Sequence, residues 1–206
     1  MEPTTEIRRL MDLMPASGRM MTKIVSKREQ LKVIDSAFPL PWQPERRILI
    51  NFDLWRRFSQ PQRDLLLLRT VSWLTAVKWF KPDIYQGVVL AGVVGATVEM
   101  LQGDIVGTIV AGGLSAIAST RIWRFYRSSQ FELNADEAAI GVAQRRGYKE
   151  AEAAEHLLSA IEAGPKLEKR RHLDFLELVR CQNLRAISGL SPVGIPETLK
   201  NQNNDG

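Results

Sequence analysis

The sequence predicts a mostly helical α+β protein with a small N-terminal antiparallel sheet, an apolar two-helix hairpin and a C-terminal helical bundle. Three observations carry this prediction: β-branched runs within residues 20–52, an almost uncharged stretch over 84–120, and helical periodicity from residue 134 onward. A chain of 206 residues fits one domain, placed here at 1–189. The Pro- and Asn-rich tail at 190–206 is predicted to be disordered.

The N-terminal part alternates between helical and extended patterns. Residues 5–14 place apolar side chains on one helical face, whereas residues 20–25 and 30–38 are rich in β-branched residues. Residues 47–52 give the best strand candidate. These short runs predict a small sheet, because none of them is long enough for a large one.

A long helix is predicted over residues 60–80. Ser59 is a suitable N-cap, and Gln62 at the third helical position completes a capping box. The run of leucines at 65–68 is apolar on every side of this helix. We therefore expect other elements to surround it for at least one turn.

Three further helices are predicted in the C-terminal part. They cover residues 134–146, 150–163 and 167–187, and they are separated by Gly147 and by the Gly-Pro pair at 164–165. Glycine and proline commonly end helices, so these positions are expected to be helix boundaries.

The hairpin over 84–120 suggests contact with a lipid bilayer. Glu99 is the one charge in residues 84–101, and residues 105–120 carry none. Basic residues lie on both sides of the hairpin, which predicts a transmembrane hairpin with both chain termini in the cytoplasm. The flanking bases are Lys78, Lys81, Arg121, Arg124 and Arg127. The alternative is an apolar hairpin buried inside a protein without a membrane anchor.

Composition excludes other classes of protein. The net charge of +5 is not concentrated in a basic run with interleaved aromatics, so nucleic-acid binding is not expected. The single cysteine, Cys181, excludes an intrachain disulfide. Asp64 is predicted to lie on a solvated face.

One motif points to a known family. Glu132 is followed by Ala135 and Asp136 at the opening of a helix, and this Glu-x-x-Ala-Asp stretch comes after a strand, a capped helix and an apolar hairpin. In this order the elements over residues 30–163 resemble the HtpX-type membrane zinc metallopeptidases. The resemblance implies that Glu132 matches the third zinc ligand and that Asp136 supports its helix. It also implies a His-Glu-x-x-His motif in the helix before the hairpin.

That metal-binding motif is replaced in this chain. The matching positions hold Arg69, Thr70 and Trp73, none of which is a zinc ligand or a general base at neutral pH. We therefore expect no metal, no cofactor and no protease activity. Arg69 is expected to fill the metal position and to pair with Glu132. The alternatives are a solvated Glu132, or a shift of one helical turn that brings Arg63 to this place.

These features predict a non-catalytic, membrane-anchored pseudo-metallopeptidase that acts as a binding, scaffold or assembly factor for other membrane proteins. It would capture an extended segment along an edge strand, and it would have no small-molecule substrate. The predicted edge strand contains Ile48, Leu49, Ile50 and Asn51. The whole chain also resembles an uncharacterised domain family of cyanobacterial proteins, which implies a thylakoid or plasma membrane.

Two other functions stay open at this point. The first is an enzyme with an unrecognised non-metal site around Glu132, Asp136 and Arg69. The second is a soluble or peripheral basic protein whose apolar hairpin is buried.

Overall fold

The computed structural model of the protein describes residues 2–40, 43, 45–77, 91–95, 97–98 and 128–190. The chain divides into two compact units, one built from residues 1–77 and 129–206 and the other from residues 78–128. Within the second unit, residues 91–95 and 97–98 are helical. All further description concerns the first unit.

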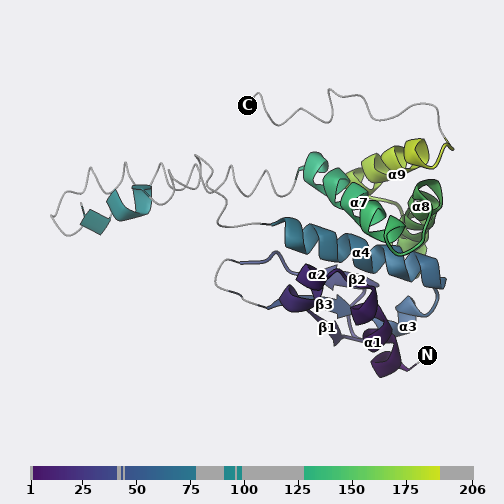
Figure 1. The fold of residues 1–206 in the computed structure, drawn as a ribbon, viewed down its shortest axis with the longest axis horizontal. Helices are drawn as coiled ribbons and strands as arrows, with labels where there is room; N and C mark the ends of the chain where they lie inside the picture. The colour runs from purple at the N-terminus through teal and green to yellow at the C-terminus, as the bar shows by residue number, and fades with distance from the viewer. Residues whose placement is uncertain are drawn as a thin grey trace. The chain divides into compact units, whose positions relative to one another are not determined.

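The first unit has an N-terminal α/β part and a C-terminal helical part, labelled as in Figure 1. The N-terminal part contains α1 (Pro3–Leu13), α2 (Ala16–Met21), β1 (Thr22–Ser26), β2 (Ile34–Ser36), β3 (Arg46–Ile50) and α3 (Phe52–Trp55). The helical part contains α4 (Gln60–Ala76), α7 (Ser129–Gln144), α8 (Glu150–Leu167) and α9 (Phe175–Ile187). The predicted class, mostly helical α+β with a small sheet, is therefore confirmed.

The three strands form a mixed sheet in the order β1-β3-β2. β1 runs parallel to β3, with Ile24 opposite Ile48, and β2 runs antiparallel to it, with Asp35 opposite Leu49. The prediction of an antiparallel sheet was therefore wrong for β1. Strand direction depends on the path of the connecting chain, and the local residue pattern does not encode that path.

Helix α4 lies between the sheet and the C-terminal helices, as Figure 1 shows. Its Leu67 and Leu74 belong to the core that α4 shares with the sheet and α1. Leu65 and Leu68 belong to a second core, which α4 shares with α7, α8 and α9. Leu65, Leu67 and Leu68 are buried between two layers and Leu66 is partly buried, so other elements surround the leucine run as its apolar character predicted. Both cores depend on this one helix.

The helix boundaries agree with the sequence where local signals are strong. Ser59 caps α4 and forms the predicted capping box with Gln62. In contrast, α8 continues through Gly164 and Pro165 to Leu167, so the predicted break there was wrong. Proline near the end of a helix removes only one late hydrogen bond, and α8 accommodates this loss in its last turn.

The membrane predictions were also wrong. Most of the predicted hairpin at 84–120 lies outside the described residues, as do residues 191–206 of the predicted tail. Among the helices that the structure does describe, none combines the length and the apolar character needed to cross a bilayer. This finding overturns the predicted transmembrane anchor and the integral-membrane localisation with cytoplasmic termini.

Candidate functional site

The candidate site is built on one face of α4. Arg69 and Trp73 lie one helical turn apart, so their side chains leave the helix in the same direction. Thr70 is buried, and its hydroxyl donates to the carbonyl of Leu66 in its own helix at 2.9 Å. Thr70 therefore has a structural hydrogen bond on this face, whereas Arg69 and Trp73 extend toward α7.

Helix α7 brings Glu132 to both of these side chains. Glu132 lies in the first turn of α7. Its carboxylate forms an ion pair with Arg69 and accepts a hydrogen bond of 3.0 Å from the indole nitrogen of Trp73. The predicted Arg69–Glu132 pair is therefore confirmed. The side chains at positions 69, 73 and 132 therefore converge in this geometry.

Asp136 extends the pair into a buried charge network. It lies one turn after Glu132 and is completely buried. Arg180 of α9 donates to both of its carboxylate oxygens at 2.7 and 2.8 Å, and Arg69 Nε lies 3.5 Å from Oδ1. Two guanidinium groups and two carboxylates thus alternate between α4, α7 and α9, which compensates charges that would be costly to bury alone.

The two arginines respond differently to this burial. Desolvation, together with repulsion from Arg180, lowers the pKa of Arg69 to about 9, although Asp136 opposes the change. For Arg180, desolvation acts in the same direction, but the bidentate Asp136 outweighs it and raises the pKa. Both groups are therefore cations at neutral pH, and Arg69 is the less well compensated of the two.

A pocket of about 440 Å³ opens beside this network, within the usual size range of ligand sites. Three of its walls come from α4 with Glu132, from residues 32–36, and from the connection between α8 and α9. The α4 and α7 residues on its wall are Leu66, Arg69, Thr70, Trp73 and Glu132. All but Asp136 of the predicted site positions on α4 and α7 therefore line one cavity.

Residues 168–174, between α8 and α9, form the opposite wall, which we call the strap. Glu168 accepts a hydrogen bond of 2.9 Å from the backbone N–H of Val33, which joins the strap to the start of β2. Arg170 donates to Glu168 at 2.9 Å and to both oxygens of Glu177 at 2.8 and 2.7 Å. Burial acts to raise the pKa of Glu177, but Arg170 outweighs it and holds that pKa below its ordinary value.

Aromatic rings enclose Trp73. Phe38, just after β2, and Phe131 of α7 both meet it edge-on, with ring centroids 6.0 and 6.2 Å away. Edge-on contacts of this kind stabilise a pair by about 0.5–1.5 kcal/mol beyond area burial. The indole is therefore held in place with its N–H directed at Glu132.

The predicted edge strand is in fact the centre of the sheet. Ile48, Leu49 and Ile50 belong to β3, which pairs with β1 on one side and β2 on the other, and Asn51 caps the following helix α3. These residues have no free edge for a ligand, so that part of the prediction was wrong. Among the described strands β2 is the edge strand next to the pocket.

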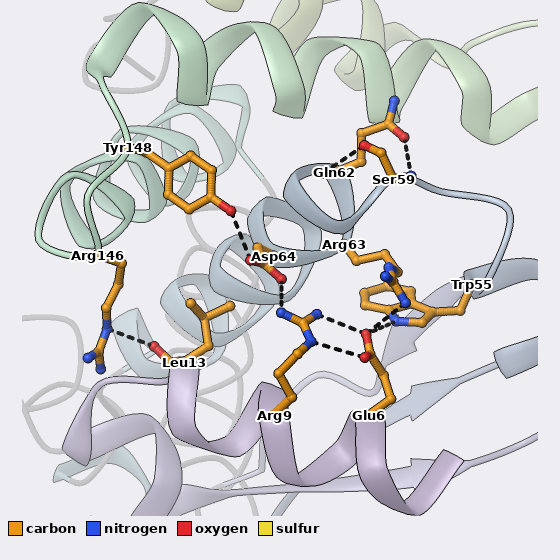
Figure 2. Close-up of polar contacts among 10 residues, drawn as sticks. All are labelled: Glu6, Arg9, Leu13, Trp55, Ser59, Gln62, Arg63, Asp64, Arg146 and Tyr148. Atoms are coloured by element: carbon orange, nitrogen blue, oxygen red, sulfur yellow. Dashed lines mark hydrogen bonds and ion pairs between the residues drawn. The ribbon is translucent and has the colours of Figure 1, made fainter. Parts of the chain in front are cut away.

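A second charge network, shown in Figure 2, was not expected from the sequence. Glu6 of α1 accepts hydrogen bonds from Arg9 and from the indole of Trp55, and it pairs with Arg63 at 3.0 Å. Arg9 also donates to Asp64 at 2.6 Å, and Tyr148 donates to the other Asp64 oxygen at 2.9 Å.

This second network corrects two sequence expectations. Asp64 is 3% exposed, so its predicted position on a solvated face was wrong. Arg63 pairs with Glu6 in this network, and it is Arg69 that reaches Glu132. Because Arg9, Tyr148 and Asp64 lie far apart in sequence, only the folded chain brings them together.

The described residues hold no group of three His, Cys, Asp or Glu side chains that could bind a metal ion. Fold and site together define a class: a mostly helical α+β domain with a pocket lined by both charged and apolar side chains, next to an edge strand. The chain belongs to the DUF3318 family of proteins of unknown function, whose sequence profile matches residues 8–148. No curated protein and no solved structure matches it. The family match ends before α8 and α9, which supply the strap and Arg180.

Proposed function

We propose that the protein is a non-catalytic binding protein that holds an extended peptide segment in the pocket, along the free edge of β2. One observation carries the proposal: residues 34–36 are both the edge strand and a wall of the cavity. A strand with unpaired backbone groups beside a preformed cavity is suited to strand addition. The backbone then provides affinity, and the pocket side chains provide selectivity.

The register of β2 identifies which backbone groups are free to bind. Asn51 donates its N–H to the carbonyl of Val33, whereas the Val33 N–H donates to Glu168, so position 33 has a single ladder bond that sets the register of β2 on β3. Hydrogen-bonded and non-bonded pairs alternate along an antiparallel ladder, which makes Asp35 the next bonded residue. The N–H and C=O groups of Ile34 and Ser36 therefore point away from β3.

The charged groups of the pocket support binding rather than catalysis. Both oxygens of Glu132 are engaged, one by Trp73 and the other by Arg69. Acid–base or nucleophilic catalysis would need a reacting hydroxyl, thiol or amine within hydrogen-bond reach of such a carboxylate. The neighbouring hydroxyl of Thr70 donates to its own helix. These groups hold the wall of the pocket in one arrangement.

Substitutions at Ser36 test the binding mode. Ser36→Pro removes one outward N–H without removing a ladder bond, because proline is tolerated on an edge strand. Short fluorescently labelled peptides of alternating valine and threonine are expected to bind the wild type and Ser36→Ala alike, and to lose about tenfold in affinity for Ser36→Pro. Fluorescence anisotropy measures this. Equal binding by all three proteins would contradict strand addition.

The proposal includes descent from a zinc site of the HtpX type. It is supported by the convergence of positions 69, 73 and 132, where a guanidinium now provides the positive charge. The triple variant Arg69→His/Thr70→Glu/Trp73→His should therefore bind about one zinc ion per chain, because it supplies two imidazoles one turn apart facing Glu132. Elemental analysis after gel filtration measures the zinc.

The matched control for the zinc experiment adds Glu132→Ala to the triple variant and should lose the metal. A folded triple variant that binds no zinc would contradict the proposed descent. It would not affect the proposal that the wild type binds a peptide. The two parts of the proposal are thus tested separately.

An enzyme is the second candidate, favoured by the meeting of Glu132, Asp136 and Arg69 at one site. Ester and peptide substrate panels, incubated with wild type and with Glu132→Gln, test this possibility. Turnover by the wild type that is lost in the variant would replace the binding proposal with a catalytic one.

A further inference from the structure

We infer that Glu168 of the strap is an autoinhibitory residue, whose carboxylate occupies the start of the β2 edge until an incoming peptide displaces it. The inference rests on the proposed binding function and names a regulation of the same site. It is carried by the hydrogen bond from the backbone of Val33 to the side chain of Glu168 and by the contacts around that bond.

The backbone of Val33 is divided between the sheet and the strap. Val33 lies directly before β2, and its carbonyl accepts the N–H of Asn51 at 3.0 Å. Its N–H donates at 2.9 Å to Oε1 of Glu168, a residue 135 positions later in the chain. Both Val33 and Glu168 line the pocket. The donor at the start of the edge strand is therefore already taken by an acceptor from the opposite wall.

This acceptor lies in the path of an added strand. In strand addition, the backbone N–H groups of the edge bind carbonyl oxygens of the incoming peptide. Ile34 is the next residue of the edge, so a peptide that pairs with Ile34 and continues past it meets the Glu168 side chain at Val33. Peptide and Glu168 then compete for the same donor and the same space.

The acceptor that is already in place is charged, whereas a peptide carbonyl is neutral. Hydrogen bonds to an ionised carboxylate are about twice as strong as those between neutral groups. The Glu168 side chain is also only 11% exposed, and its other oxygen, Oε2, accepts from Arg170 at 2.9 Å. Displacement of Glu168 therefore lowers the net affinity for any peptide that reaches Val33.

The strap keeps its place without the Val33 contact. Its backbone donates two hydrogen bonds, of 2.9 and 2.8 Å, to carbonyls in the last turn of α8. Arg170 also donates to both oxygens of Glu177. A displaced Glu168 side chain keeps Arg170 as a partner through Oε2. The contact with Val33 thus closes the edge of β2 without supporting the pocket wall.

Removing the Glu168 side chain tests the competition. Glu168→Ala should bind labelled peptides of alternating valine and threonine about tenfold more tightly than the wild type, because the Val33 donor is then free for the peptide. Glu168→Gln keeps a neutral acceptor and should have an intermediate affinity. Fluorescence anisotropy with the full-length protein measures the affinities, and circular dichroism checks that each variant is folded.

Glu162→Ala is the matched control. Glu162 lies in α8 shortly before the strap, is 42% exposed and pairs with Arg185 at 2.6 Å. It does not line the pocket. The control therefore makes the same change in net charge and should leave the peptide affinity unchanged.

Hydrogen exchange of the Val33 amide gives a readout that does not depend on affinity. The amide should be protected in the wild type, exchange faster in Glu168→Ala, and become protected again when peptide is added. A residue that only braces the strap would not allow a peptide to restore this protection. Nuclear magnetic resonance with isotope-labelled protein measures the exchange.

The outcomes separate this inference from the proposed function. Equal or weaker peptide binding by Glu168→Ala, or failure of that variant to fold, would overturn autoinhibition. Peptide binding itself would stand if Ser36→Pro still weakened it. Binding by Glu168→Ala alone would support both proposals. If no peptide binds to the wild type or to Glu168→Ala, the proposed function fails and the inference fails with it.

Discussion

The Glu132 carboxylate receives a neutral donor from Trp73 and a charged one from Arg69. Removing either donor would leave a carboxylate in a partly desolvated wall, so the three side chains act as one unit. Arginine is favoured at position 69 because its planar guanidinium group can contact the carboxylates of Glu132 and Asp136 at the same time and stays charged. A lysine would present a single point charge to two separate carboxylates.

Glu6 is the corresponding residue of the second network and should make stability depend on pH. Burial acts to raise its pKa, but hydrogen bonds from Arg9 and Trp55 and the charges of Arg9 and Arg63 outweigh burial, so the pKa is lowered. A carboxyl group whose pKa is lower in the folded than in the unfolded chain stabilises the folded state at pH values above its ordinary pKa of 4.5. This contribution is lost as the pH falls through the folded-state pKa.

Glu6→Gln is therefore expected to lower the free energy of unfolding by about 1–3 kcal/mol at pH 7, since it removes the carboxylate partner of the partly buried Arg9 and Arg63. The difference from wild type should narrow below the ordinary pKa of 4.5. Urea unfolding between about pH 3 and pH 7 measures the difference, with Glu2→Gln, at the exposed N-cap position of the same helix, as control. A difference that does not change with pH would mean that the charge of Glu6 contributes nothing.

At the scale of elements, α2 packs closely on α4 at Gly18. A Cβ atom added there would lie 2.5 Å from Cγ1 of the buried Val71. Gly18→Ala should therefore destabilise the protein by about 1–3 kcal/mol, although alanine is the better helix former. Thermal unfolding followed by circular dichroism measures the effect.

Gly141 provides a matched control for Gly18, because it lies in α7 and a Cβ there meets no atom within 4 Å. Gly141→Ala should be neutral or stabilising by up to about 1 kcal/mol. Equal effects at the two glycines would show that the packing of α2 on α4 is looser than the structure indicates.

The strap and the first turn of α9 depend on each other as elements. Asp174 and Glu177 form a capping box at the start of α9, and Glu177 also binds Arg170. Glu177 therefore fixes both the first turn of the helix and the wall of the pocket. A change in this cap would alter the opening of the pocket even though it lies at the end of a helix.

At the scale of the whole molecule, the first unit is interrupted by residues 78–128 between α4 and α7. These helices already meet through Arg69 with Glu132 and through Trp73 with Phe131. Replacing residues 78–128 by a Gly-Ser linker of about ten residues, which spans about 17 Å on average, should leave the first unit folded. A shorter connection also reduces the entropy cost of pairing the two helices.

The excision variant is checked by its helical content, by the cooperativity of its thermal unfolding and by its affinity for the labelled peptides. An aggregated or non-cooperative product would mean that the first unit requires the segment for stability. Retained folding with lost affinity would place part of the binding site in the excised residues.

Local signals explain how much of the fold could be predicted. The cap of α4 was predictable because Ser59 and Gln62 act on adjacent backbone. The start of α9 was missed, although Asp174 and Glu177 form the same type of capping box and could have located it. The parallel pairing of β1 with β3 could not be read from the sequence, since it joins segments separated by the whole of β2.

The candidate site was predictable in part for the same reason. The spacing of Arg69 and Trp73 on one helix, with an acid at the opening of a later helix, identified the wall that contains Glu132. Arg180 and the strap were missed, because their contacts with Asp136 and Val33 depend on how α9 packs against the unit. Burial of Asp64 depended likewise on partners distant in sequence.

The enclosure of Trp73 also has a spectroscopic consequence. Its indole lies on the pocket wall between two phenylalanine rings, whereas the fully buried Trp55 lies in the second network and does not line the pocket. An occupant along β2 would displace water beside Trp73 and change its intrinsic emission, against a background from the other four tryptophans of the chain. The pocket therefore carries its own optical reporter, so that ligands can be screened without labels and assigned to this site by loss of the signal in Trp73→Phe.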